Sequence, residues 1–191
     1  MMRIATILGL CAAPMLAAAQ GLPDKIPGLP GLVGGDYSLT NQYGETHTQA
    51  DPDGKTQLLF FGYANCLQIC SSVLPQMAVV ADEVAELTGA QIRPVMITVD
   101  PKFDTVDNIG PALTQYHDDF IGLTGTEDEL QVAYDAFAVE KEFLFEDPEY
   151  GPVYSHGSFM YLLDGEGKTL TLIPPILPDE QIVEIISNYV S

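Results

Sequence analysis

The order of two apolar segments around one amphipathic segment constrains the fold of this chain most. Residues 56–62, TQLLFFG, are nearly continuous apolar sequence of strand length, as expected for a strand covered on both faces of a sheet. Between residues 66 and 87, apolar side chains recur at spacings of three and four, which predicts the buried face of a helix. Residues 92–99 form a second β-rich run. Strand, helix and strand in this order predict a right-handed crossover between parallel strands.

The remaining segments extend this unit into one α/β domain, as expected for 191 residues. Residues 37–40 and 46–48 predict an N-terminal β-hairpin, and residues 140–154 predict an inserted loop or hairpin before the third core strand. Further strands are expected at residues 120–123, 158–163 and 169–173, and further helices at residues 106–117, 126–137 and 179–190. This order of elements is that of a thioredoxin-like fold with insertions, here predicted for residues 36–191.

The charge balance of the chain excludes some classes of partner. Asp and Glu number 27 against 7 Lys and Arg, which gives a formal net charge of −20. Affinity for nucleic acid depends on cationic side chains that displace phosphate counterions, so no nucleic-acid partner is expected. The same negative field repels anionic lipid headgroups, so strong membrane binding is not expected either.

The first residues have the pattern of a secretory signal. Residues 4–19 carry no charge, follow Arg3 and end in Ala17-Ala18-Ala19, which predicts a signal peptide over residues 1–19 and export to the periplasm. The run of 16 residues contains Pro14 and is shorter than the about 20 that a spanning helix needs, so membrane anchoring is the less favoured alternative. Cys11 would leave with the signal. Residues 20–35 are rich in Gly and Pro and are interpreted as an extended leader.

A C-x-x-x-C motif, Cys66 to Cys70, lies where the first central strand passes into its helix. If the helix begins at Cys66, residues four apart share one helical face, and a helix N-terminus favours thiolate over thiol. Such a pair can bind a soft metal or close a disulfide. His156 comes shortly before the strand expected at residues 158–163, so its imidazole would face the two sulfurs. Two thiolates and one imidazole suit Cu(I).

Four segments in order resemble the Sco/SenC family, copper-binding assembly factors of respiratory cytochrome c oxidase. They are Phe61-Gly62-Tyr63 leading into the C-x-x-x-C motif, residues 97–101 (ITVDP) with Asp104-Thr105, residues 120–126 (FIGLTGT), and His156 with Phe159 and residues 161–164 (YLLD). The resemblance covers residues 32–190. It implies a thioredoxin-like fold that binds copper through Cys66, Cys70 and His156. It also implies a role in maturing the binuclear copper centre, with a copper-receiving oxidase subunit and a periplasmic thiol reductant as partners.

The sequence departs from the family pattern at positions beside the predicted ligands. Family members usually have proline after each motif cysteine, where this chain has Leu67 and Ser71. Phe103 stands where the family usually has arginine, and Ser155 stands where an acidic residue commonly precedes the histidine. All three predicted ligands are retained, so the departures concern the ligand loop and partner docking.

Two functions from different classes fit these residues. The first is an exported copper metallochaperone. The second is a thiol–disulfide oxidoreductase that reduces client cysteines, with Cys66 as the attacking thiolate and Cys70 as the resolving thiol. A structural disulfide is the simplest alternative for an exported protein. His156 discriminates between the two functions, because copper binding needs an imidazole there and exchange chemistry does not.

Several other residues of ligand type are assigned no metal role. His47 and His117 are interpreted as exposed side chains on the hairpin and on a helix, because isolated histidines are weak signals. Met77, Met96 and Met160 lie on predicted apolar faces and are interpreted as core residues. A peroxiredoxin is a weaker alternative, because Tyr63 stands where that family has its threonine.

Overall fold

A seven-stranded mixed sheet forms the centre of the computed structural model, which describes residues 32–190. The order of its strands is β2-β1-β5-β4-β3-β8-β9. Their bounds are Ser38–Asn41 for β1, Thr46–Thr48 for β2, Thr56–Gly62 for β3, Ile92–Thr98 for β4, Ile121–Thr124 for β5, Met160–Leu163 for β8 and Thr169–Ile173 for β9. The predicted signal peptide and most of the predicted leader lie outside the described residues, so both stay predictions.

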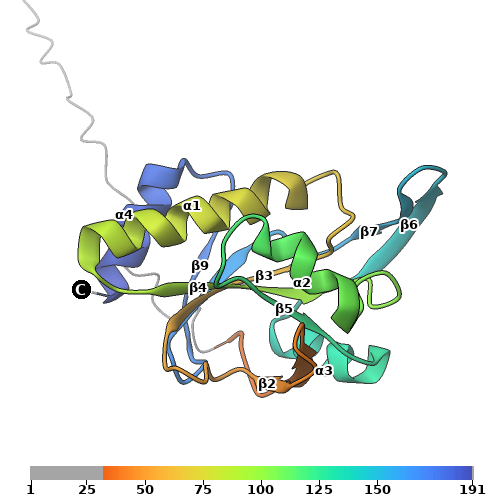
Figure 1. Cartoon of the computed structure of the whole chain (residues 1–191), viewed down its shortest axis with the longest axis horizontal. Coiled ribbons are helices and arrows are strands. Elements are labelled where there is room, and N and C mark those ends of the chain that lie inside the picture. Colours follow the sequence, from red (N-terminus) through yellow and green to blue (C-terminus); the bar gives the residue numbers. More distant parts are fainter. Residues whose placement is uncertain (1–31, 191) are drawn as a thin grey trace, which may run out of the picture.

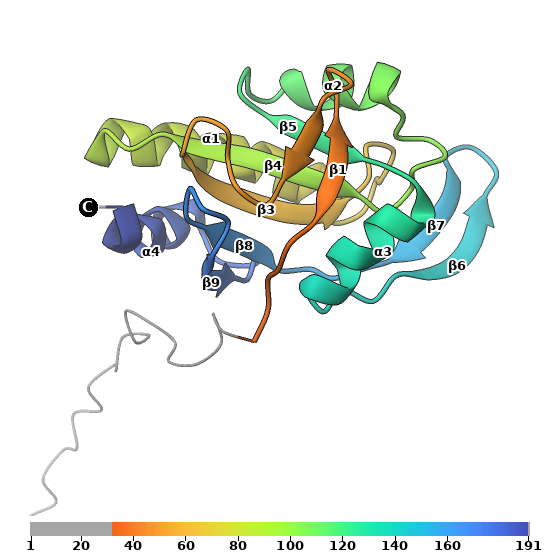
Figure 2. The ribbon, with the colours of Figure 1, turned by 90° about the horizontal axis from the view of Figure 1, so that it is seen from below.

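The three central strands β3, β4 and β5 run parallel, and the outer strands are antiparallel to their neighbours. Helix α1 (Cys70–Thr88) connects β3 to β4, which confirms the predicted crossover. Because β3 and β4 are parallel, the chain leaves both strands at the same edge of the sheet (Figure 2). The segments that follow Gly62 and Thr98 therefore lie close together.

Helices cover both faces of the sheet. Helices α1 and α4 (Asp179–Val190) lie side by side on one face, and α3 (Glu127–Ala136) lies on the other (Figure 1). Helix α2 (Val106–Thr114) packs against β5 and ends three residues before the predicted end. Helix α3 begins one residue after its predicted start, because Thr126 is its N-cap: Thr126 and Glu129 cap the helix reciprocally, each side chain accepting from the backbone N–H of the other. The thioredoxin-like fold predicted from the order of elements is confirmed.

Residues 142–155 form a hairpin outside the central sheet. Strands β6 (Glu142–Asp147) and β7 (Gly151–Ser155) pair only with each other and project from one end of the molecule (Figures 1 and 2). Phe143, Leu144 and Phe145 are each about half exposed on this hairpin. The described part of the chain contains no helix that is both long and apolar enough to cross a membrane.

The interpretation of His47 as an exposed residue is wrong. Side chains alternate between the two faces of a strand. In β2 the side chains of Thr46 and Thr48 are exposed, whereas that of His47 points inward. Only 4% of His47 is exposed, and this burial lowers its pKa. The interpretation of Met77, Met96 and Met160 as core residues is confirmed, because all three are fully buried.

Arg93 at the start of β4 is the centre of an ion-pair network away from the cysteines. Its guanidinium donates to Asp51 at 2.6 Å, to Asp53 at 2.7 Å and to Asp119 at 3.3 Å. Lys55 also bonds Asp119, at 2.5 Å. Both Arg93 and Asp51 are buried, so each charge depends on the other for compensation.

The buried pair predicts a large effect of removing one partner. Arg93→Ala should lower the free energy of unfolding by about 3 kcal/mol, because it leaves the Asp51 carboxylate buried without its counter-charge. Lys168→Ala is the matched control, since it removes the same charge from an exposed side chain without an ion pair. Urea unfolding followed by circular dichroism measures both, and similar small losses in the two variants would contradict the prediction.

Candidate metal centre

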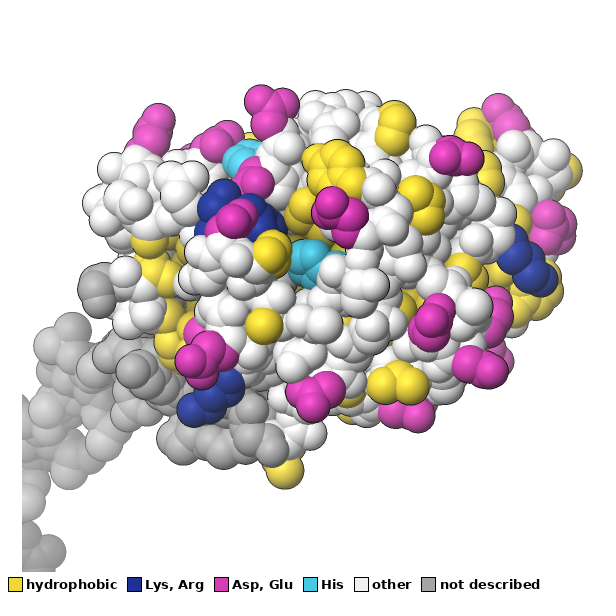
Figure 3. Space-filling view, turned by 60° about the horizontal axis from the view of Figure 1, so that its bottom comes forward, with side chains coloured by type: hydrophobic (Ala, Val, Ile, Leu, Met, Phe, Trp, Pro, Cys, Tyr) yellow, Lys and Arg dark blue, Asp and Glu magenta, His cyan; other side chains and the backbone are white. Residues whose placement is uncertain are grey.

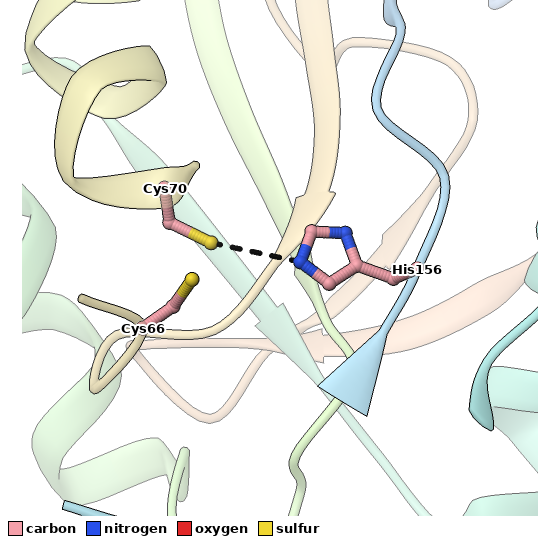
Figure 4. A group of neighbouring side chains, drawn as sticks. All are labelled: Cys66, Cys70 and His156. Atoms are coloured by element: carbon pink, nitrogen blue, oxygen red, sulfur yellow. Dashed lines mark hydrogen bonds between the residues drawn. The ribbon is translucent and has the colours of Figure 1, made fainter. Parts of the chain in front are cut away.

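The three predicted ligands come together at the carboxyl edge of β3. Cys66 lies in the loop after β3, Cys70 is the first residue of α1, and His156 lies between β7 and β8. Their donor atoms all lie within 4.8 Å of one another, and the Cys70 Sγ to His156 Nε2 distance is 3.7 Å (Figure 4). Among the described residues, this is the only group of three or more His, Cys, Asp or Glu side chains that lie close enough together to hold one metal ion.

The two cysteines do not share a helical face, so that part of the prediction is wrong. Helix α1 begins at Cys70, four residues later than expected, and Cys66 belongs to the preceding loop. That loop makes a turn in which the Cys66 N–H donates to the Tyr63 carbonyl at 3.2 Å. The Asn65 side chain also donates to the Tyr150 carbonyl of the β6–β7 turn. The sulfurs therefore converge because the loop is held by partners elsewhere in the fold.

Asp104 also anchors the ligand loop, residues 63–69, which carries Cys66. No role was predicted for Asp104 from the sequence. Its carboxylate accepts from the Ala64 N–H at 3.1 Å and from the Thr98 hydroxyl at 2.7 Å, and the side chain is fully buried. Burial raises the pKa of Asp104 to about 6. The available signal was its place just after β4, because the segments that follow neighbouring parallel strands meet at one edge.

Gly62 is the second residue of the site whose role was not predicted from the sequence. A Cβ atom on this glycine would lie 2.8 Å from the Phe60 ring and 3.1 Å from the Cys70 sulfur. The first of these distances is shorter than real Cβ contacts, so a side chain at residue 62 would displace the buried Phe60 ring. It would also push the Cys70 sulfur away by a few tenths of an ångström. The sequence motif Phe61-Gly62-Tyr63 carried this information, but only as a mark of resemblance.

The imidazole of His156 is oriented by its surroundings. Its Nδ1 lies 3.0 Å from the Gly157 carbonyl, which can only accept, so Nδ1 carries the proton and Nε2 presents a lone pair toward the sulfurs. The ring also makes edge contacts with Phe60 and Tyr63, at centroid distances of 5.8 and 6.0 Å. A histidine that donates through one nitrogen and offers the other is arranged as metal-binding histidines are.

The two thiols are electrostatically unequal. A hydrogen bond from Cys70, together with bonds from the backbone N–H groups of Cys70 and Gln68, lowers the pKa of Cys66 to about 4. The pKa of Cys70 is raised, first by this hydrogen bond to Cys66 and then by burial. Cys66 is therefore the more readily ionised of the two thiols. A cation that binds both sulfurs replaces any proton that they still hold.

Comparison with known proteins identifies the family. The family model described as SCO1/SenC matches residues 27–191. The chain belongs to the SCO1/SenC family. It is 36% identical over 159 residues to an SCO2-like protein of Rickettsia conorii, which covers 82% of this chain and 76% of the relative. It is 31% identical over 140 residues to the human mitochondrial SCO1 homolog, which covers 73% of this chain but only 46% of the human protein.

Solved Sco structures share the fold. The crystal structure of Arabidopsis thaliana ScoI with copper bound superimposes with a TM-score of 0.75 at 28% identity, covering 82% of this chain and 99% of that one. Yeast Sco1 with copper bound gives a TM-score of 0.72 at 27% identity, covering 83% of this chain and 88% of that one. The family resemblance found in the sequence is thereby confirmed.

The lowered pKa of Cys66 predicts that its thiol is already ionised in the metal-free, reduced protein at pH values well below about 8.5, the ordinary pKa of a thiol. Ultraviolet absorbance of the thiolate, measured against pH as the difference from Cys66→Ala, should reveal one group that is ionised throughout the neutral range. Cys70→Ala removes the main hydrogen bond to Cys66 and should move this titration toward the ordinary value. A Cys66 thiol that titrates near 8.5 in both proteins would contradict the assignment.

Proposed function

We propose that this chain binds one copper ion through Cys66, Cys70 and His156 and serves as a copper metallochaperone in the assembly of cytochrome c oxidase. One observation carries the proposal: two cysteine sulfurs and an oriented imidazole nitrogen, contributed by three separate segments, lie within 4.8 Å of one another. The two sulfurs form no disulfide in this structure, so both are free to bind a metal.

The geometry and chemistry of the donor set fit copper. Donors bonded to one ion at about 2.0–2.3 Å can be up to about 4.6 Å apart, so the 3.7 Å separation of Cys70 and His156 fits without adjustment. The 4.8 Å limit for the whole group requires a shift of at most a few tenths of an ångström. Thiolates select soft Cu(I), and imidazole also suits copper. The same donors accept zinc, so the choice of copper rests on the relatives.

The relatives support both halves of the proposal. Arabidopsis ScoI and yeast Sco1 have been crystallised with copper bound. BsSco, which shares the fold at 21% identity, is described as a member of the Sco family of cytochrome c oxidase assembly proteins. We extend copper binding and the assembly role to this chain because it belongs to that family and contains the Cys-Cys-His group.

The exposure of the three ligands suggests the order in which they would release the copper ion. Cys66 and Cys70 are 5% and 1% exposed, whereas His156 is only partly buried. An incoming thiolate of a copper-receiving oxidase subunit would displace the imidazole first. The two cysteines would then be exchanged one at a time, and Cys70, the thiol of higher pKa, would regain its proton. No electron is transferred in this exchange.

The thiol–disulfide oxidoreductase alternative is favoured by one observation, the unequal pair of thiols. A Cys66 thiolate would attack a client disulfide and release one client thiolate. The Cys70 thiolate, after losing its proton, would then attack the Cys66 sulfur, release the second client thiolate and close a Cys66–Cys70 disulfide. A dithiol reductant in the same compartment would be needed to restore the pair. This scheme gives His156 no coordinating role, which is why we prefer copper binding.

We further propose that the protein works in the periplasm. The support is the pattern of residues 1–19, an uncharged run behind Arg3 with Ala17-Ala18-Ala19 at its end. An oxidising compartment also explains the need for a thiol reductant partner, because the cysteine pair binds copper only in its reduced form.

Copper titration tests the proposed function. The reduced protein should bind one equivalent of Cu(I) in competition with a chelator, and Cys66→Ser or Cys70→Ser should weaken binding by at least about 100-fold, because a hard hydroxyl replaces a soft thiolate. His156→Ala should weaken it by about 10- to 100-fold. His117→Ala is the matched control and should bind as the wild type does. Equal affinity in the His156 and His117 variants would remove His156 from the site, and preference for zinc over copper would overturn the choice of metal.

A further inference from the structure

A groove lies between helix α3 and the start of the β6–β7 hairpin. Its volume is about 540 Å³. Residues of α3 form one wall, and residues 139–143 with Tyr154 form the other. Two kinds of side chain dominate the lining, tyrosines and carboxylates; they are Tyr134, Tyr154, Glu127, Asp135, Glu140 and Glu142. Tyr154 is partly exposed, whereas Tyr134 is buried, with Lys141 lying over its ring.

The protein places one of its own cations in this groove. The Lys141 ammonium lies 5.1 Å from the centroid of the Tyr154 ring, 5.9 Å from that of the Tyr134 ring and 3.3 Å from a Glu127 oxygen. An ammonium within about 6 Å of an aromatic face is attracted by the ring quadrupole. The side chain of Lys141 is only 17% exposed. The groove therefore already has the contacts of a site for an organic cation.

One lysine leaves the groove strongly anionic. Four carboxylates line it against the single charge of Lys141. The other Lys and Arg residues between positions 32 and 190 are Lys55, Arg93, Lys102 and Lys168. None of them lines this groove, and Lys55 and Arg93 are held in the network around Asp51 and Asp119. Acidic side chains are also spread over the face drawn in Figure 3, where Lys and Arg appear at few places.

We propose that this groove binds an arginine side chain from a basic segment of a partner protein, and that Lys141 is the internal occupant which the arginine displaces. Arginine fits better than a second lysine, because its planar guanidinium stacks on aromatic faces, pairs with carboxylates in a bidentate way and is more weakly hydrated. The net charge of the chain would draw a basic partner toward this surface.

A displaced Lys141 has a second carboxylate within its electrostatic reach. Asp100 is 2% exposed, and its Oδ1 atom has no hydrogen-bond partner. Burial raises the pKa of Asp100, and the charge of Lys141 counteracts part of this effect. Glu127 is therefore not the only carboxylate that acts on the charge of Lys141.

The groove also lies next to the candidate metal centre. The Tyr154 ring forms an edge contact with Tyr63 at a centroid distance of 5.8 Å, and Tyr63 in turn contacts His156 at 6.0 Å. A partner segment held here would lie one aromatic side chain away from the residues around His156. The inference does not depend on copper binding, because the groove and its occupant are complete in the metal-free protein.

A titration of the full, metal-free chain with two short peptides tests the proposal. The probe is acetyl-Gly-Arg-Gly-amide, and its neutral counterpart carries citrulline in place of arginine. Nuclear magnetic resonance should show saturable shifts of the Tyr134 and Tyr154 ring protons with the arginine peptide, weakened by salt, and no saturable shift with citrulline. Equal responses to the two peptides would overturn the proposal, because charge recognition is its basis.

Variants then separate displacement from general charge attraction. Lys141→Met should bind the arginine peptide about fivefold more tightly, because the internal competitor is gone, and more tightly than Lys168→Met, which removes the same charge at an exposed position outside the groove. Glu127→Gln should weaken binding by about threefold, and this exposed substitution should leave the circular dichroism spectrum unchanged. Equal affinities in Lys141→Met and Lys168→Met would overturn the role of Lys141. Copper affinity measured on the same variants reports separately on the proposed function.

Discussion

Parallel pairing of β3 with β4 is the constraint on which the rest of the site depends. The register places Gly62 opposite Thr98, so the ligand loop and the segment after β4 leave the sheet side by side. The Val99 N–H then donates to the Gly62 carbonyl at 2.8 Å, and Asp104 reaches back to the Ala64 N–H. The bond between Ala64 and Asp104, which helps to position Cys66, exists because these two strands are neighbours.

The third predicted ligand depends on an insertion instead of on the core crossover. Strand β8 pairs antiparallel with β3, which brings the segment before Met160 to the same edge of the sheet. The β6–β7 hairpin precedes that segment and contacts the ligand loop through Tyr154 and the Tyr150 carbonyl. The β6–β7 hairpin thus borders both the candidate metal centre and the groove around Lys141.

The sequence predicted those elements whose limits are set locally. Strand β3 and helix α4 have the predicted bounds, and α3 begins one residue after its predicted start, because apolar runs and helical spacings are visible in the sequence. The start of α1 was misplaced because hydrogen bonds to Tyr63, Asp104 and Tyr150 hold residues 63–69 outside the helix. No local pattern contains those bonds. His47 was misjudged because a three-residue strand gives too short an alternation to show which face is buried.

The three candidate ligands could be predicted from the sequence, whereas the residues that hold them in position could not. Two cysteines and a histidine are chemically conspicuous, and the family resemblance gave their order along the chain. Gly62 and Asp104 act through close approach and burial, and these properties appear only when β3, β4 and α1 are packed. The aromatic and acidic groove around Lys141 likewise joins α3 to a hairpin that the sequence left as a loop or hairpin.

X-ray absorption at the copper edge tests the central claim most directly, because it reports the atoms bound to the metal. The account predicts that the Cu(I)-loaded protein has a first shell of two sulfurs and one imidazole nitrogen, and that His156→Ala keeps the sulfurs and loses the imidazole scattering. A first shell without sulfur, or imidazole scattering that persists in His156→Ala, would contradict it.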